Sequence, residues 1–369
     1  MKKLFTTIIF VANLQLWANA QLTALPAGGN KRALVYEQVG LTDVTIRYNR
    51  PHVNKREGKI WGQLIPVGFI DQGFGTSKAA PWRAGANENT TIEFSTDVKV
   101  EGQPLAAGRY GFSVAYDPNE CTLIFSKNST SWGSFFYNPD EDALRVKVKP
   151  VATDKSVEWL RYEFADQGPA SAIVQLEWEK LVIPFKIEVD VVANQLASFR
   201  KELRSNKGFT WENWNQAAQY CAQNKVNLDE ALTWANQAIS PNFGGSQSFA
   251  AWKTKSIVLD SLGRKDEAAD AMKKALPFAN VFQVYIYAND LVNQKKTDEA
   301  FALFKMNYDK EPNNLYTTIG MASGYSAKGD YKIALGYAQK ALTFATGPNV
   351  AIVNLAITDL QKGRDMNLD

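Results

Sequence analysis

A stretch of polar and aromatic side chains between residues 49 and 90 contains the residues best suited to chemistry. The stretch is rich in Gly, Pro, Lys and Arg, and a loop of this length inside a compact domain is often functional. An arginine there could hold an anionic or hydroxyl-rich ligand with its planar fork of donors, and a tryptophan could stack on a sugar. The candidate ligand-binding residues are Arg50, Trp82, Arg83, Asn87 and Glu88.

The same side chains also have structural explanations. Arg83 and Glu88 could pair with each other or fix the loop, and Asn87 could occupy the left-handed region in a tight turn. Arg50 could simply end a strand at a sheet edge. His52 is the only histidine, and its basic, glycine-containing surroundings predict an exposed side chain. Only the arrangement of these residues in space decides between the two interpretations.

Standard catalytic and cofactor motifs are absent from the sequence. Any Ser-His-Asp or Cys-His arrangement would have to use His52, and no Gly-x-Ser-x-Gly segment is present. No phosphate loop, dinucleotide fingerprint or zinc spacing occurs, so we expect no cofactor and no metal. The sequence therefore favours a non-catalytic binding or scaffold protein. Because glycosidase carboxylates are placed by the fold, the alternative is a glycan-acting or other hydrolytic enzyme with a site in the 49–90 loop.

The elements that must position the loop are strands. Apolar side chains alternate with polar ones in five segments, as in Val44, Ile46 and Tyr48 against Thr45 and Arg47. Such a pattern places one set in a core and the other in water. The segments lie at 44–48, 110–116, 144–149, 174–179 and 183–189. Many short strands joined by Gly- and Pro-containing turns predict an all-β domain at 33–190, an antiparallel sandwich or barrel.

The chain changes character near residue 190, where a repeat begins. Pro241, Pro277, Pro312 and Pro348 are separated by 36, 35 and 36 residues. A period near 34 with small residues at regular positions is typical of tetratricopeptide helical hairpins. We therefore expect a tetratricopeptide-like solenoid at 191–369, ending in a capping helix. Such arrays commonly bind a protein or peptide on a concave face.

The first twenty residues have the pattern of a secretory signal peptide. A basic start is followed by an apolar run and by Ala18-Asn19-Ala20, a small-residue cleavage pattern. We expect residues 1–20 to be removed, residues 21–32 to form a short linker, and the protein to be exported, to the periplasm or beyond the cell. No later segment is apolar enough to predict a transmembrane span.

The net charge argues against nucleic acid as a partner, and the two cysteines bear on whether a disulfide is present. The net charge is +3, without the concentrated basic charge that nucleic-acid binding requires. Cys121 and Cys221 fall in different expected domains, so a disulfide would have to join the domains. Two buried free thiols are the simpler expectation. The arginines of the 49–90 loop indicate a carbohydrate or a small anionic ligand as the candidate partner of the β-domain.

The first half also resembles an exported bacterial family known only as domain of unknown function family 2911. The matching segments are GLTDVTI (40–46), YNRP (48–51), IWG (60–62), WRAGANENTTI (82–92), GRY (108–110), WG (132–133), LRVKV (144–148) and VIPFKIE (182–188). The resemblance implies export and an all-β domain, which in members is often followed by helical repeats. It implies no activity. The chain departs from the family pattern at 68–81, which looks like an insertion.

Overall fold

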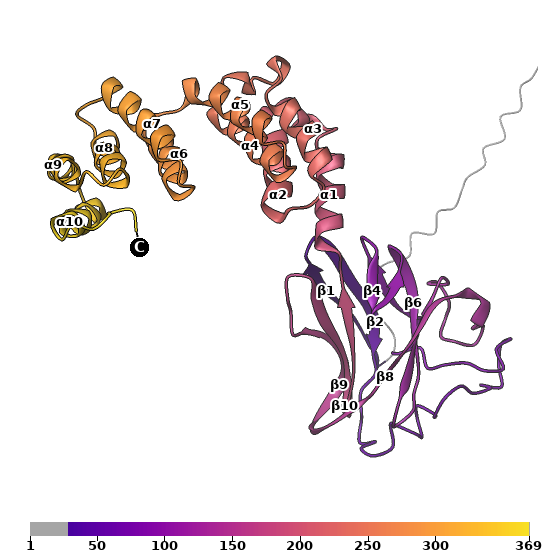
Figure 1. Cartoon of the computed structure of the whole chain (residues 1–369). Helices are drawn as coiled ribbons and strands as arrows, with labels where there is room; N and C mark the ends of the chain where they lie inside the picture. The colour runs from indigo at the N-terminus through magenta and orange to yellow at the C-terminus, as the bar shows by residue number, and fades with distance from the viewer. Residues whose placement is uncertain (1–28, 369) are drawn as a thin grey trace, which may run out of the picture. The chain divides into compact units, whose positions relative to one another are not determined.

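The computed structural model describes residues 29–368 of the 369-residue chain. The expected signal peptide and most of the expected linker lie outside the described residues. The described chain divides into two compact units, with the boundary after Asn194. The first unit consists of strands and the second of helices (Figure 1). The expected boundary at 190/191 coincides with the start of the first helix, α1 (Val191–Glu202).

The first unit is a sandwich of two antiparallel sheets, as the alternating pattern predicts. The larger sheet has six strands in the order β1-β2-β3-β6-β7-β8. Its strands are β1 (Lys31–Val39), β2 (Thr42–Arg50), β3 (Thr90–Phe94), β6 (Gly108–Ala115), β7 (Cys121–Ser126) and β8 (Asp142–Val148). The smaller sheet has the order β5-β4-β10-β9. Its strands are β4 (Val98–Val100), β5 (Gln103–Leu105), β9 (Val151–Ala165) and β10 (Ser171–Glu188).

The core between the sheets contains the residues that the period-two pattern placed there. Val44, Ile46 and Tyr48 are at most 5% exposed, whereas Arg47 between them is exposed. Phe112, Phe125 and Phe185 form a connected aromatic cluster in the same core. Each large apolar side chain buried in this way contributes roughly 1.5–3 kcal/mol. The sequence thus fixes which face of each strand points inward.

The long segment between β2 and β3 contributes to this core. Trp61 and Trp82 both pack on Trp178 of β10, with ring centroids 6.1 Å apart in each case. The backbone of Trp82 pairs with that of Val114 at the end of β6. The expected long loop is therefore present, and aromatic packing together with isolated backbone pairs holds it in place.

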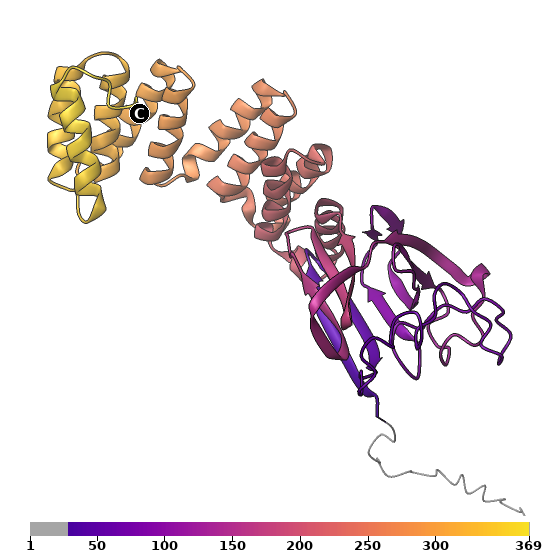
Figure 2. The same cartoon turned by 90° about the horizontal axis from the view of Figure 1, so that it is seen from below.

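The second unit is a tetratricopeptide-like array of helical hairpins. Its helices after α1 are α2 (Trp211–Asn224), α3 (Leu228–Ala238), α4 (Phe249–Ser261), α5 (Lys265–Ala275), α6 (Val281–Asn293), α7 (Thr297–Lys310), α8 (Leu315–Ala327), α9 (Tyr331–Leu342) and α10 (Pro348–Gln361). Each even-numbered helix from α2 to α8 packs on the helix that follows it, and α10 packs on α9. Figure 2 shows these pairs following one another along the array.

Small residues allow the paired helices to approach closely. Ala322 of α8 and Ala334, Ala338 and Ala341 of α9 are 0% exposed and share one core cluster. The turn between α8 and α9 contains Gly329 at φ +84°, a conformation that favours glycine. The predicted capping helix is α10, which supplies Val353 and Leu360 to the same cluster. No helix within residues 29–368 has both the length and the apolar character to cross a membrane.

Candidate functional sites

The candidate residues of the 49–90 loop have different partners. Arg50 donates from Nε to the carbonyl of Leu160 at 2.8 Å, so it ties the end of β2 to β9. Trp82 donates from its indole nitrogen to the carbonyl of Gly85 at 3.1 Å and stacks on Trp178. Both side chains therefore hold the fold together. Their ligand-binding role stays a prediction.

Arg83 and Asn87 stabilise a tight turn. The guanidinium of Arg83 donates to the carbonyl of Asn87 at 2.9 Å and lies 5.4 Å from the ring centroid of Phe135. Partial burial lowers the pKa of Arg83 from its ordinary value. Asn87 has φ +59°, the left-handed conformation that the structural interpretation predicted. The same turn is anchored to the core through the carbonyl of Ala84, which accepts from Tyr162 at 2.8 Å.

Glu88 pairs with Arg32 and not with Arg83, so of the two structural alternatives the pairing with Arg83 is wrong, while Arg83 does hold the loop. Its carboxylate contacts the Arg32 guanidinium and accepts from the amide of Asn49 at 2.7 Å. The hydrogen bond from its own backbone amide, followed by that from Arg32, lowers the pKa of the Glu88 carboxyl. An ionised carboxylate suits a charge partner better than a proton donor. His52 stacks on Trp159 with centroids 4.6 Å apart, so it is half-buried and not the exposed residue expected.

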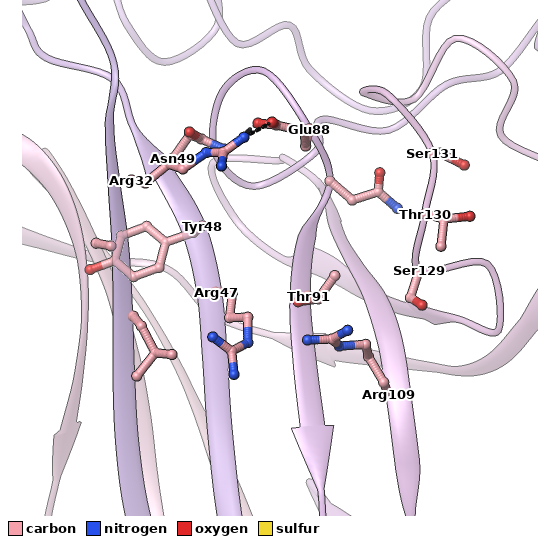
Figure 3. Close-up of a pocket in the computed structure, with 13 residues that line it drawn as sticks. Arg32, Arg47, Tyr48, Asn49, Glu88, Thr91, Arg109, Ser129, Thr130 and Ser131 are labelled. Carbon is pink, nitrogen blue, oxygen red and sulfur yellow. Dashed lines mark hydrogen bonds and ion pairs between the residues drawn. The ribbon is translucent and has the colours of Figure 1, made fainter. Parts of the chain in front are cut away.

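Glu88 alone among the five candidates reaches a pocket of about 610 Å³ on the outer face of the six-stranded sheet. Three arginines from the same sheet line this pocket: Arg32 on β1, Arg47 on β2 and, beyond β3, Arg109 on β6. Figure 3 shows the guanidinium of Arg109 reaching from β6 across β3, beneath Thr91, toward the side of the sheet that carries Arg47. Sequence reasoning used Arg47 only as an outward-facing strand residue and missed the pocket.

A loop over the sheet completes the pocket with hydroxyl groups. Ser129, Thr130 and Ser131 of this loop line the pocket, and Figure 3 shows the loop on the far side of Arg109 from Arg47. The loop can pass this close because residue 111 is glycine. A Cβ there would lie 2.3 Å from the carbonyl oxygen of Asn128. The pocket thus depends on a close backbone approach between β6 and the loop.

The helical array contains a separate groove with different chemistry. Helices α2, α4 and α6 each place side chains one turn apart along it, and its volume is about 390 Å³. Ile257, Phe282 and Ile286 line the groove and are 37–44% exposed. Asn215 also lines it, and its buried Oδ1 makes no hydrogen bond with any described residue.

Other candidate chemistry is limited. Residues 29–368 contain no cluster of three or more His, Cys, Asp or Glu side chains placed to hold a metal ion. Cys121 and Cys221 are buried free thiols, as expected. Burial raises the pKa of Cys121 and raises the pKa of Cys221 to about 11. Both thiols are therefore neutral at physiological pH and poor nucleophiles.

Comparison with known protein families finds a match that lies in the β-domain. Residues 30–187 match the family described as "Protein of unknown function (DUF2911)". The β-domain therefore carries this family's domain, as the resemblance in sequence implied. No curated protein matches this chain.

Solved structures resemble the chain over its helical part. One is YrrB, described as a TPR protein with an unusual peptide-binding site, at 19% identity and a TM-score of 0.31. The match covers 47% of this chain and 88% of YrrB. Another is MamA, at 16% identity and a TM-score of 0.30, with 40% of this chain and 79% of MamA covered.

Proposed function

We propose that this is a non-catalytic binding protein whose helical array holds an extended peptide segment of a protein partner in the groove of α2, α4 and α6. The observation that carries the proposal is the combination, in one groove, of exposed apolar side chains with a buried amide oxygen that has no hydrogen-bond partner among the described residues. Soluble proteins seldom leave apolar side chains grouped on a surface without a partner. Buried polar atoms are nearly always hydrogen-bonded.

The groove chemistry fits a peptide in particular. Phe282 and Ile286 lie one turn apart on α6, with Ile257 on α4, so they can receive an apolar side chain. The amides of Asn215 and Gln219 offer donors and acceptors to a peptide backbone, and Gln283, whose Oε1 accepts from the Asn280 amide, offers its Nε2 donors. Lys253 adds one positive charge and favours a peptide with an acidic group.

The experiment is selection of peptides from a displayed random library on the full chain, followed by fluorescence polarisation with the selected peptide. We expect Phe282→Glu and Ile257→Glu to weaken binding at least tenfold, about 1.4 kcal/mol or more, because each places a charge where the apolar anchor binds. Ile352→Glu is the matched control, since Ile352 is 63% exposed on α10 and does not line the groove. Equal loss in all three variants would reject the groove as the site.

Asn215→Leu separates binding from folding. The Oδ1 atom has no partner in the described protein, so its removal should leave the free energy of unfolding unchanged or raise it. The same change should weaken peptide binding, because the backbone loses its amide partner. A variant that loses stability while binding the peptide normally would show that Asn215 is a structural residue.

We also propose that the protein acts outside the cytoplasm. The support is the basic start, apolar run and Ala18-Asn19-Ala20 pattern of the sequence. The test is the mass of the mature protein from cells that express the full chain. A mature N-terminus at Gln21 is expected, and a chain that retains its first twenty residues in the cytoplasm would reject export.

A further inference from the structure

We propose that the pocket on the outer face of the six-stranded sheet binds an acidic saccharide, with Arg47 and Arg109 as the anion-binding residues. The proposal concerns the β-domain and does not depend on peptide binding by the helical array. It rests on charge, on the polar lining opposite that charge, and on the size of the pocket.

The charges of the pocket are incompletely compensated. The Arg32 guanidinium is already paired with Glu88, and Arg109 shares a longer contact of 3.3 Å with Glu93. The guanidinium of Arg47, the central arginine of the three, makes no hydrogen bond or ion pair with any residue in the described range 29–368, whereas its backbone pairs with β1 and β3. Arg47 and Arg109 line the same pocket, and like charges that share one space repel each other unless an anion compensates them. A carboxylate or sulfate accepts paired donors from such groups.

The opposite wall supplies groups that match sugar hydroxyls. Ser129, Thr130 and Ser131 each carry a hydroxyl that can donate and accept. Asn89 donates from Nδ2 to the carbonyl of Asn128 at 3.3 Å, but its buried Oδ1 has no partner among the described residues. An unpaired acceptor beside three hydroxyls suits a ligand that carries its own hydroxyl donors. Leu34, 47% exposed at the pocket, offers an apolar contact to a sugar ring.

Size and charge distribution argue against other anions. A pocket of about 610 Å³ is in the usual range for a small organic ligand and far exceeds the needs of a single inorganic ion. Nucleic acid would require a basic surface that continues along many phosphates. Here the three arginines are confined to one pocket in a chain of net charge +3. A neutral sugar would not compensate the charge of Arg47.

The test is isothermal titration of the full chain with a galacturonic-acid trisaccharide. The comparison ligands are the neutral galactose trisaccharide and sodium sulfate, and a short single-stranded DNA tests for general polyanion binding. We expect the acidic trisaccharide to bind at least tenfold more tightly than each of the others, and more weakly as salt is raised. Equal binding of sulfate or DNA would overturn the saccharide assignment. Equal binding of the neutral sugar, or no binding of any ligand, would overturn the proposal.

Variants locate the binding to the pocket. Arg47→Gln and Arg109→Gln should each weaken binding of the acidic trisaccharide at least tenfold, with unchanged circular dichroism, because both side chains are at the surface. Arg204→Gln is the matched control, since Arg204 is an exposed arginine in the helical unit. If all three variants lose affinity equally, the effect is one of net charge and the pocket is not the site. Peptide binding by the groove should be the same in all of them, so failure of either proposal is distinguishable.

Discussion

The groove of the helical array and the pocket of the β-domain differ in how the sequence builds them. The groove uses pairs of residues one helical turn apart, such as Ile257 with Lys253 and Phe282 with Ile286. The pocket gathers residues from strands β1, β2, β3 and β6 and from a loop near residue 130. A helical repeat therefore carries its surface chemistry in local spacing, whereas the sheet surface depends on strand order and register. The two sites also differ chemically, because one is apolar with amides and the other is basic with hydroxyls.

The largest expected effect tests whether the two units are energetically separate. Trp178→Ala removes a side chain that is 1% exposed and packs on Trp61 and Trp82. Such a truncation costs about 3–5 kcal/mol because of the cavity it leaves. Hydrogen exchange should show lost amide protection at residues 29–194 and little change at 195–368, since Trp178 lies in the core cluster of the first unit and the second unit has core clusters of its own.

The reciprocal variant is Phe304→Ala, which removes a side chain 1% exposed in the helical array. Its effect should be confined to the second unit and strongest near α6, α7 and α8, because repeats are stabilised mainly by their neighbours. If either substitution lowers protection equally in both units, the units unfold together. The two units would then differ in their binding sites but not unfold independently.

A smaller effect is expected from replacing a glycine by alanine once in each unit. The change in the free energy of unfolding should have opposite signs at the two positions. Gly111→Ala should lower the free energy of unfolding by about 1–3 kcal/mol, because the new Cβ would overlap the Asn128 carbonyl. Gly336→Ala, at an exposed position of α9 with nothing within 4 Å of the new Cβ, should raise it by about 0.5–1 kcal/mol. Urea unfolding of both variants measures the two shifts. A neutral Gly111→Ala variant would show that the loop is free to move away, and the pocket would then be less rigid than its geometry indicates.

These differences explain what the sequence predicted and what it did not. The inward face of β2 and the hairpins around Ala322 and Ala334 follow from local periods of two and 3.6 residues, and both were predicted. The partners of Arg83 and Glu88 were not, because the pairing of Glu88 with Arg32 requires β1 to lie beside β2. Arg47 was identified as outward-facing, yet its position beside Arg109 depends on the insertion of β3 between their strands. A signal was present in the outward arginines of the alternating segments, but strand order was needed to combine them.

The smallest expected effect is a change in a carboxyl pKa. Glu230 in the helical array and Glu88 in the pocket both have a lowered pKa, but the main cause differs. In the array, the hydrogen bond from Arg200 is the largest cause that lowers the pKa of Glu230. In the pocket, the largest cause for Glu88 is its own backbone amide, and Arg32 comes after it. Arg200→Gln should therefore return the pKa of Glu230 toward its ordinary value, whereas Arg32→Gln should change that of Glu88 less. Carboxyl titration followed by NMR measures both shifts, and an equal change in the two carboxyls would contradict the expectation.

The ion pair of Arg200 with Glu230 also predicts how the stability of the array depends on pH. Glu230 has a lowered pKa in the folded protein, so its pairing with Arg200 stabilises the fold above the ordinary carboxyl pKa of 4.5. That contribution is lost as the pH falls through the lowered value. Both side chains are partly exposed, so the pair is worth only about 0.2–1 kcal/mol. The difference in unfolding free energy between the wild type and Arg200→Gln should therefore be small at pH 7 and should decrease as the pH falls below 4.5 through the lowered pKa. A difference that persists in acid would mean that Arg200 stabilises the array through the packing of its aliphatic chain.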